Sequence, residues 1–278
     1  MKKILLILIS LSVLGLTSIS NAKSIRIGTE GAYPPWNNLN SAGELEGAEI
    51  DFGNEACSRM GVDCEWVTQD WDGIIPALLQ GKYDIIIAGM SITEERKEKV
   101  NFTNGYMTDG ARFAVMKGSG LEGLTVGNGV NKVNLNNAGG KEQAAIGQLI
   151  AAMNGSTVCV QSSTIHQNFL EKHMSGAVKV KLYQSVDDHN LDLRAGRCDA
   201  VLADVGSIID FMESGGGVNV AFTGPTFSGG VFGDGVGGAV RKEDTDIVEM
   251  WNKVIAEMSA DGTTAEITKK WFGRDISM

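Results

Sequence analysis

The 278-residue sequence has few cysteines, few histidines and fewer basic than acidic residues. Its three histidines, His166, His173 and His189, show no metal-ligand spacing with its four cysteines. A formal net charge of -10 argues against nucleic acid or an anionic membrane surface as a partner. We therefore expect no metal, no other cofactor and no nucleic acid. The content of 43% apolar and 21% charged residues is typical of a globular protein.

Long hydrophobic runs are absent beyond the first residues, which argues against a transmembrane segment later in the chain. Lys2 and Lys3 precede an apolar run from Ile4 to Leu16, and the small residues Ser20 and Ala22 follow. This pattern predicts a signal peptide over residues 1–22, cleaved after Ala22. The cleavage point lacks a cysteine for a lipid anchor, so we expect a soluble, periplasmic protein.

Export makes disulfide bonds possible for the four cysteines. Cys57 lies near the end of a predicted helix and Cys64 begins the next predicted strand, so a bridge would tie the two elements together. Cys159 and Cys198 begin two other predicted strands. The pattern leaves two alternatives for this second pair, a disulfide or two buried thiols.

Strand and helix patterns alternate along the chain, which predicts an α/β fold. The predicted strands are 24–28, 65–68, 83–88, 157–160, 178–183 and 199–203. The predicted helices are 49–60, 71–79, 142–153, 165–174, 187–195, 206–212 and 244–258. The unbroken apolar character of 83–88 favours a parallel sheet covered on both faces. Residues 117–140, rich in glycine and asparagine, are predicted to form a loop insertion.

An internal repeat relates residues 68–89 to residues 183–204. Each copy reads as a helix, a glycine, a basic residue and an aspartate before four apolar residues, which predicts two similar α/β lobes. Gly89 and Asp204 stand at matching positions, just past the end of a strand. Ligands of open parallel sheets bind beyond the carboxyl ends of strands, so we expect both residues to face a shared cleft.

The residues after the strand 83–88 are suited to an anion. Ser91 and Glu94 have the spacing of a capping box, which would start a helix there and present free N–H groups. Arg96 adds a planar fork of donors for a carboxylate. The alternative is a surface ion pair between Arg96 and a nearby glutamate; the candidates are Glu94, Glu95 and Glu98.

A counterpart follows the strand 157–160. Ser163 and Thr164 could present N–H groups and hydroxyls to a carboxylate, or could simply cap the next helix. Asp204 could bind a ligand ammonium, or could cap the helix 206–212.

Aromatic residues stand near two other strand ends. Pro34 and Pro35 stiffen a loop that holds Tyr33 and Trp36, and Trp71 begins another helix. These rings could sandwich an aliphatic stem or a guanidinium, or could pack in the core. Glu30 beside them could hold a cationic tip, or could be a solvated side chain.

With these residues the chain resembles the periplasmic binding proteins of polar amino acid ABC transporters, solute-binding protein family 3. The lysine/arginine/ornithine-, histidine- and opine-binding branch is the most similar. The likeness runs from about Ser24 to Phe272. The motifs that carry it are Gly28–Trp36, Leu45–Asp51, Met90–Arg96, Ala195–Ala200, Arg241–Asp244 and Asp261–Thr263 with Lys270–Phe272.

The resemblance implies a type II periplasmic binding protein fold. Each lobe would be a mixed, mostly parallel sheet flanked by helices, and two hinge strands would join the lobes. Lobe 1 would comprise residues 23–107 and 232–278, and lobe 2 residues 108–231. The family's disulfide falls on Cys57 and Cys64.

The resemblance also assigns a ligand site. The carboxylate-binding arginine falls on Arg96, the acid for the α-ammonium on Asp204 and the acid that senses the side chain on Glu30. The aromatic sandwich falls on Tyr33 and Trp71. The remaining expected ligand-binding residues are Trp36, Ala88, Gly89, Met90, Ser91, Ser163, Thr164 and Ile165.

The implied function is capture of an L-amino acid and its delivery to an inner-membrane ABC permease by hinge closure. We expect a monomer that binds arginine, lysine, ornithine or histidine, with an opine or glutamine as alternatives. Ala88 and Gly89 are typical of opine binders, whereas an acid at Asp204 suits a primary ammonium better. His166 replaces a neutral side chain near the pocket rim.

Two other classes remain as rivals. The first is a dehydratase-like enzyme using Glu30 or His166, although the sequence suggests no dyad, triad or metal set. The second is a sensor that reports to a membrane receptor.

Overall fold

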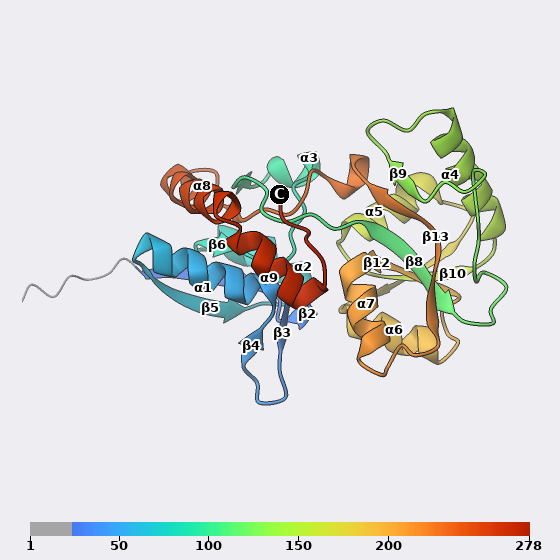
Figure 1. The fold of residues 1–278 in the computed structure, drawn as a ribbon, viewed down its shortest axis with the longest axis horizontal. Helices are drawn as coiled ribbons and strands as arrows, with labels where there is room; N and C mark the ends of the chain where they lie inside the picture. Colours follow the sequence, from blue (N-terminus) through green and yellow to red (C-terminus); the bar gives the residue numbers. More distant parts are fainter. Residues whose placement is uncertain (1–23) are drawn as a thin grey trace, which may run out of the picture.

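Two lobes lie side by side, each built on its own β-sheet (Figure 1). The computed structural model describes residues 24–278, and the predicted signal peptide lies outside the described residues. We call the part built on the five-stranded sheet the first lobe and the part built on the six-stranded sheet the second lobe. The two-lobed α/β fold predicted from the sequence is confirmed.

The first lobe has strands in the order β5-β1-β6-β14-β7. Its strands are β1 (Ser24–Thr29), β5 (Asp63–Thr68), β6 (Ile85–Ile86), β7 (Asn101–Phe102) and β14 (Ala239–Val240). Strand β1 pairs in parallel with β5 and β6, and β14 is antiparallel to β6 and β7. The helices of this lobe are α1 (Ala48–Met60), α2 (Trp71–Leu79), α3 (Glu94–Lys97), α8 (Thr245–Ala260) and α9 (Thr263–Phe272). A small sheet of β2 (Ala32–Tyr33), β3 (Asn37–Leu39) and β4 (Leu45–Glu46) projects from the lobe (Figure 1).

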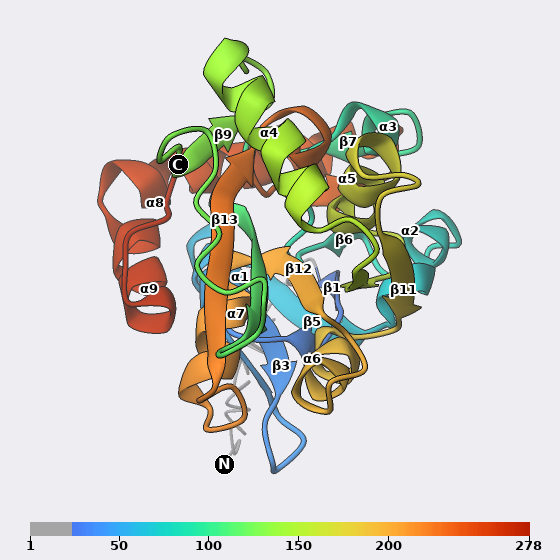
Figure 2. The ribbon, with the colours of Figure 1, turned by 90° about the vertical axis from the view of Figure 1, so that its right-hand side faces the viewer.

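The second lobe has strands in the order β11-β10-β12-β8-β13-β9. Its strands are β8 (Ala111–Met116), β9 (Lys132–Asn134), β10 (Thr157–Gln161), β11 (Lys179–Tyr183), β12 (Ala200–Asp204) and β13 (Val220–Ser228). Its helices are α4 (Gly140–Ala152), α5 (Ile165–His173), α6 (Val186–Arg194) and α7 (Val205–Glu213), with the 3-10 helix η1 (Gly230–Phe232). Figure 2 shows α4 and β13 on the outer side of this lobe.

The predicted internal repeat is present in the two sheets. Strands β5, β1 and β6 lie parallel and adjacent in the first lobe, as do β11, β10 and β12 in the second. Helices α2 and α6 occupy the same place in the two units. The carboxyl ends of β6 and β12 are therefore equivalent positions, as the sequence repeat predicted.

Two segments connect the sheets, the stretch between β7 and β8 and the stretch between β13 and β14 (Figure 1). They pair with each other, because Val236 N donates to Met107 O at 2.8 Å and Tyr106 N donates to Val236 O at 2.9 Å. A two-stranded crossing of this kind restricts the lobes to a hinge motion.

Two sequence predictions need correction in detail. The predicted strand 83–88 has only Ile85–Ile86 as a regular strand, although Asp84 N and Ile87 N still donate to β1 carbonyls. The predicted loop 117–140 contains β9, a short edge strand that pairs with β13. Three residues in a glycine- and asparagine-rich region carry too little periodicity to be predicted.

Each lobe has its own apolar core. In the first lobe, Ile27 of β1 and Phe52 of α1 belong to one buried cluster with Trp251 of α8. In the second lobe, Phe113 and Phe227 pack edge to face. None of the helices within residues 24–278 is long and apolar enough to cross a membrane.

Both cysteine pairs form disulfides. Cys57–Cys64 joins the end of α1 to β5, as expected from the resemblance. Cys159–Cys198 joins β10 to the residues before β12, so the second pair is bridged rather than free. The first bridge lies within the first lobe and the second within the second lobe, so neither crosses the hinge.

The two bridges should differ in their effect on stability, because they close loops of different length. The sequence separations are 7 and 39 residues. In the chain-entropy description, the shorter loop contributes about 2.4 kcal/mol and the longer about 4 kcal/mol. Urea unfolding of C57A/C64A and C159A/C198A should show the larger loss for the second variant. An equal or smaller loss for C159A/C198A would contradict this expectation.

Candidate ligand-binding site

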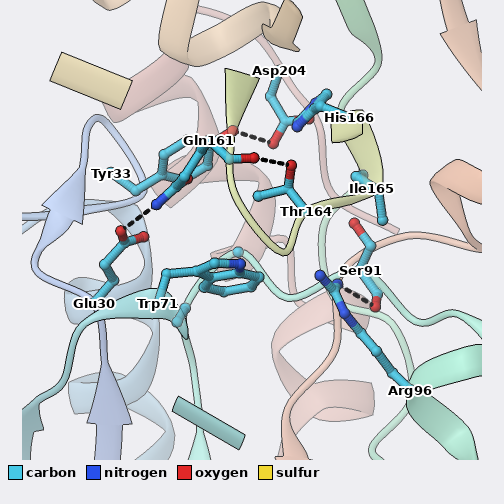
Figure 3. Close-up of a pocket in the computed structure, with 12 residues that line it drawn as sticks. Glu30, Tyr33, Trp71, Ser91, Arg96, Gln161, Thr164, Ile165, His166 and Asp204 are labelled. Atoms are coloured by element: carbon cyan, nitrogen blue, oxygen red, sulfur yellow. Dashed lines mark hydrogen bonds and ion pairs between the residues drawn. The ribbon is translucent and has the colours of Figure 1, made fainter. Parts of the chain in front are cut away.

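A cavity lies between the lobes, with about 330 Å³ of empty space including its open side. The residues that line the cavity are Glu30, Tyr33, Trp71, Ala88, Gly89, Ser91, Arg96, Gln161, Thr164, Ile165, His166 and Asp204 (Figure 3). Both lobes contribute.

The cavity lies at the carboxyl ends of the central parallel strands. Ala88 and Gly89 follow β6, and Gln161 and Asp204 end β10 and β12. Gly89 has φ +59°, a left-handed conformation that favours glycine. The structure thus brings Gly89 and Asp204 to one cleft, as the sequence repeat predicted.

Arg96 reaches the cavity from α3. Its Nη1 donates to Ser91 O at 3.0 Å, and its guanidinium lies over the Trp71 ring, 5.1 Å from the ring centroid (Figure 3). Burial of the charged end lowers the pKa of Arg96 to about 10, so the group stays protonated at neutral pH. The ion pairs among the described residues do not include Arg96, although Glu95 and Asp204 act on it at longer range. The guanidinium therefore has N–H groups left that can donate to an anion.

The capping box predicted at Ser91 is wrong. The residue that caps α3 is Thr93, whose Oγ1 accepts from Arg96 N at 3.2 Å. Ile92 N instead donates to Gly235 O at 2.8 Å, because the backbone here pairs with the second crossing segment. This pairing holds Ser91 extended at the cavity wall and delays the helix by two residues.

Asp204 receives donors from both lobes. Tyr33 donates its hydroxyl to Oδ2 at 2.7 Å, and His166 Nε2 lies 3.2 Å from Oδ1. All three side chains are buried. Burial, followed by the charge of Asp204, raises the pKa of Tyr33 well above its usual value. Asp204 makes no side-chain capping bond to α7, so its expected alternative role does not describe this structure.

Asp204 stands at the N-cap position of α7, but Asp109, on the first crossing segment, supplies the side-chain hydrogen bond to this helix start. Its Oδ2 accepts from Gly206 N at 2.6 Å and its Oδ1 lies 2.6 Å from Arg274 Nη2. Gly206 has no room for a side chain, because an added Cβ would lie 2.6 Å from the Phe272 ring. One buried carboxylate thus joins the hinge, the second lobe and the C-terminal residues of the first lobe.

Glu30 is buried rather than solvated, with 8% of its surface exposed. Its Oε1 accepts from Gln161 Nε2 across the cleft at 2.6 Å. Burial raises the pKa of Glu30 to about 7, the Gln161 bond opposes this rise, and nearby aspartates add to it.

The second-lobe helix start contributes through Thr164 and Ile165. Thr164 caps α5, with its Oγ1 accepting from Gln167 N at 3.3 Å, and it also lines the cavity. Ser163 does not line the cavity. Its N–H donates to Gln167 Oε1 and its carbonyl accepts from Trp71 Nε1 at 3.0 Å, which makes it part of the contact between lobes.

Two further predicted residues lie behind the cavity wall. Trp36 is fully buried and packs edge-on against Phe272 at 4.9 Å between ring centroids. Met90 is fully buried in the core cluster of α2 and β6. For Trp36 the structure matches the core-packing alternative, and Met90 does not line the cavity.

The sequence interpretation missed Gln161 as a lining residue and gave His166 no partner. Both face an acid of the site, and His166 with Asp204 forms a dyad that the sequence did not suggest. The signal for Gln161 was its place at the end of β10, equivalent to the end of β1 in the other lobe. The partner of Gln161 could not be identified without knowing how the lobes face each other, and the partner of His166 depends on how α5 and β12 lie within the second lobe.

Glu49 supports the cavity wall from the core. Its carboxylate accepts from Gly89 N at 2.7 and 2.8 Å, from Tyr106 Oη at 2.5 Å and from Asn37 Nδ2 at 2.9 Å. The side chain is fully buried, and burial raises the pKa of Glu49. This residue fixes Gly89 relative to the first crossing segment.

Two hydrogen bonds close the mouth of the cleft. Ser162 Oγ donates to Asp72 at 2.9 and 3.0 Å, and Asn168 Nδ2 donates to Glu95 at 2.9 Å. With the Tyr33 and Gln161 bonds they hold the lobes together. Within residues 24–278, no cluster of histidine, cysteine, aspartate or glutamate could hold a metal ion.

The comparisons with known proteins agree on one family. The model of the bacterial extracellular solute-binding proteins, family 3, matches residues 25–274. An L-arginine-binding protein of Pseudomonas aeruginosa is 37% identical over 99% of this chain and 98% of its own. An octopine-binding periplasmic protein of Rhizobium meliloti is 36% identical over 92% of both chains.

A solved structure agrees with these relatives. It is a periplasmic His/Glu/Gln/Arg/opine family-binding protein from Silicibacter pomeroyi in complex with lysine. The similarity has a TM-score of 0.72 at 35% identity, and it covers 91% of this chain and 99% of the other.

Replacing Glu49 with glutamine should destabilise the fold at neutral pH. The amide offers one acceptor oxygen, and its NH₂ group must face donors from Gly89, Tyr106 or Asn37. An unmatched buried donor costs about 1–3 kcal/mol. Urea unfolding measures this loss, and E98Q, at an exposed glutamate of the same lobe, is the matched control. Equal stability of E49Q and E98Q would contradict the role given to Glu49.

Proposed function

The chain belongs to the bacterial extracellular solute-binding proteins, family 3, and we propose that it captures an L-amino acid with a basic side chain. It delivers this ligand to an inner-membrane ABC permease. The observation that carries the proposal is the charge pattern of the cleft. One enclosed guanidinium, which pairs with no carboxylate in the described part of the chain, shares a cavity with two buried acids.

The charge pattern fits a zwitterion with a cationic side chain. Arg96 binds the α-carboxylate with charge-assisted hydrogen bonds. Asp204 binds the α-ammonium, and Glu30 binds the cationic end of the side chain. Tyr33 and Trp71 flank the aliphatic stem between them.

The other predicted site residues have lesser roles in this proposal. Ala88, Gly89 and Ser91 form the first-lobe wall, and Thr164 and Ile165 form the second-lobe wall. Trp36, Met90 and Ser163 support these walls from behind.

Closure is the mechanism by which ligand binding is reported to the permease. The ligand bridges residues 23–107 and 232–278, which we assign to lobe 1, and residues 108–231, which we assign to lobe 2. Its contacts to both lobes exist only in the closed state, so its binding energy shifts the population toward that state. A permease that docks both lobes would then recognise the loaded form.

The relatives support arginine as the first candidate, since one of them is named for L-arginine and a solved neighbour holds lysine. Octopine, named for another relative, and glutamine are the alternatives. The chain would act as a periplasmic monomer after cleavage behind Ala22.

The dyad of His166 and Asp204 supports a second candidate, an enzyme of the dehydratase kind, in which His166 moves a proton. We propose binding without turnover, because Tyr33 and His166 each contact one carboxylate oxygen of Asp204. The relatives, moreover, are named as binding proteins. Mass spectrometry of amino acids incubated with the protein distinguishes the two. Unaltered ligand supports binding, and a dehydrated product supports catalysis.

Replacing Arg96 with alanine should weaken amino acid binding by about 2–5 kcal/mol, because it leaves the ligand carboxylate buried without its partner. Isothermal titration calorimetry measures this change. R194A, which removes an exposed arginine of α6, is the control and should keep the original affinity. The same affinity in R96A and R194A would contradict the assignment.

A thermal-shift screen should identify the ligand class. At a ligand concentration of 100 Kd, binding to the folded state adds about 2.7 kcal/mol to its stability. We expect arginine, lysine or ornithine to raise the melting temperature and aspartate to leave it unchanged, because the acids of the cleft repel a second carboxylate. A rise with aspartate alone would contradict a basic ligand.

A further inference from the structure

Glu30 lies between the lobes with one of its two oxygens bonded. Oε1 accepts from Gln161 Nε2, and none of the donors in residues 24–278 bonds Oε2. The side chain is 8% exposed and lines the cavity (Figure 3). Oε2 is therefore a hydrogen-bonding position that the protein leaves open in a desolvated place.

The charges that surround Glu30 are negative. Asp70 precedes α2, Asp72 lies in its first turn and Asp187 lies in the first turn of α6. Together with burial, which is the larger effect, they raise the pKa of Glu30 to about 7, while the Gln161 bond opposes the rise. The group is thus poised between its two protonation states near neutral pH.

The other charged groups of the cavity are engaged elsewhere. Arg96 lies over Trp71 and donates to Ser91 O. His166 is paired with Asp204. Figure 3 shows these charged ends apart from the Glu30 carboxyl group, beyond Trp71 and Gln161. No cation within the cavity fixes Glu30 as a carboxylate.

We propose that Glu30 selects between two classes of ligand side chain by its protonation: the carboxylate binds a cationic side chain, and the carboxylic acid binds a neutral amide or ureido side chain. The inference rests on the proposed function, because it assumes that an amino acid occupies this cavity. It deepens that function by giving one site two ligand classes.

The chemistry of the two forms differs at Oε2. A carboxylate oxygen accepts from a guanidinium or ammonium and neutralises it in a desolvated place. A carboxylic acid carries an O–H that donates to the carbonyl oxygen of an amide or ureido group. With the carboxylate form, the same carbonyl would face a second acceptor, which is unfavourable. Gln161 continues to bond Oε1 in both cases.

The direction of the pH dependence follows from these contacts. Below pH 7 the ligand-free protein holds a proton on Glu30, and a cationic ligand must displace it. Cation affinity therefore falls as pH falls, by about 30-fold from pH 8 to pH 5.5. The affinity for a neutral ligand is constant at low pH and falls as pH rises through 7.

L-arginine and L-citrulline test this inference, because they have nearly the same shape and differ in side-chain charge. Calorimetry of the wild-type protein from pH 5.5 to pH 8 should show the ratio of arginine to citrulline affinity rising with pH. At pH 6.5, titrations in buffers of different ionisation enthalpy should show about 0.8 proton released per arginine bound. A purely structural role for Glu30 would release none.

Two variants isolate Glu30 from the other titrating groups. E30Q cannot change protonation, so the arginine-to-citrulline ratio should be independent of pH, and citrulline binding shows that the variant is folded. E30D keeps an acid and should keep a pH-dependent ratio. Any pH dependence due to His166 would appear in wild type and E30Q alike.

The outcomes separate this inference from the proposed function. If arginine binds without proton release and the ratio of arginine to citrulline affinity does not change with pH, the role of Glu30 is overturned and the proposed function stays intact. A failure of arginine, lysine, ornithine and histidine to bind at any pH overturns both.

Discussion

A guanidinium enclosed between two lobes, with no carboxylate among residues 24–278 to pair with it, is the interaction on which the site depends. Removing a charge from water costs several kcal/mol unless a partner compensates. Arg96 has partial compensation from the Ser91 carbonyl and the Trp71 ring. A ligand carboxylate would complete the compensation of this charge. The unfavourable burial of Arg96 in the empty cleft therefore favours ligand binding.

The two acids of the cleft differ from Arg96 because the protein supplies donors to them from the opposite lobe. Tyr33 donates to Asp204 and Gln161 donates to Glu30 across the cleft. These bonds favour closure, and so do the contacts of Asp72 and Glu95 at the mouth. A ligand must offer more than these internal donors do, and a cation meets that requirement at both acids. Selectivity is thus a difference between ligand contacts and contacts the protein can make alone.

The sequence predicts the order of strands and helices and the two-lobed repeat, because hydrophobic periodicity and helix-ending glycines are local signals. It also predicts that Gly89 and Asp204 face one cleft, since equivalent strand ends in two similar lobes face each other. Pairing between distant segments was not predictable in the same way. The bond from Ile92 to Gly235 moves the start of α3, and the partner of Gln161 depends on the relative placement of the lobes. The partner of His166 depends on how α5 and β12 lie within the second lobe. The pairing of Cys159 with Cys198 likewise required the spatial proximity of β10 and the start of β12.

The most direct test of the account is a crystal structure of the protein with L-arginine bound. The account predicts the Arg96 guanidinium about 2.7–2.9 Å from the ligand carboxylate, with the ligand ammonium beside Asp204. A bound arginine whose carboxylate lies against the second lobe alone, with the Arg96 side chain turned out of the cleft, would contradict it.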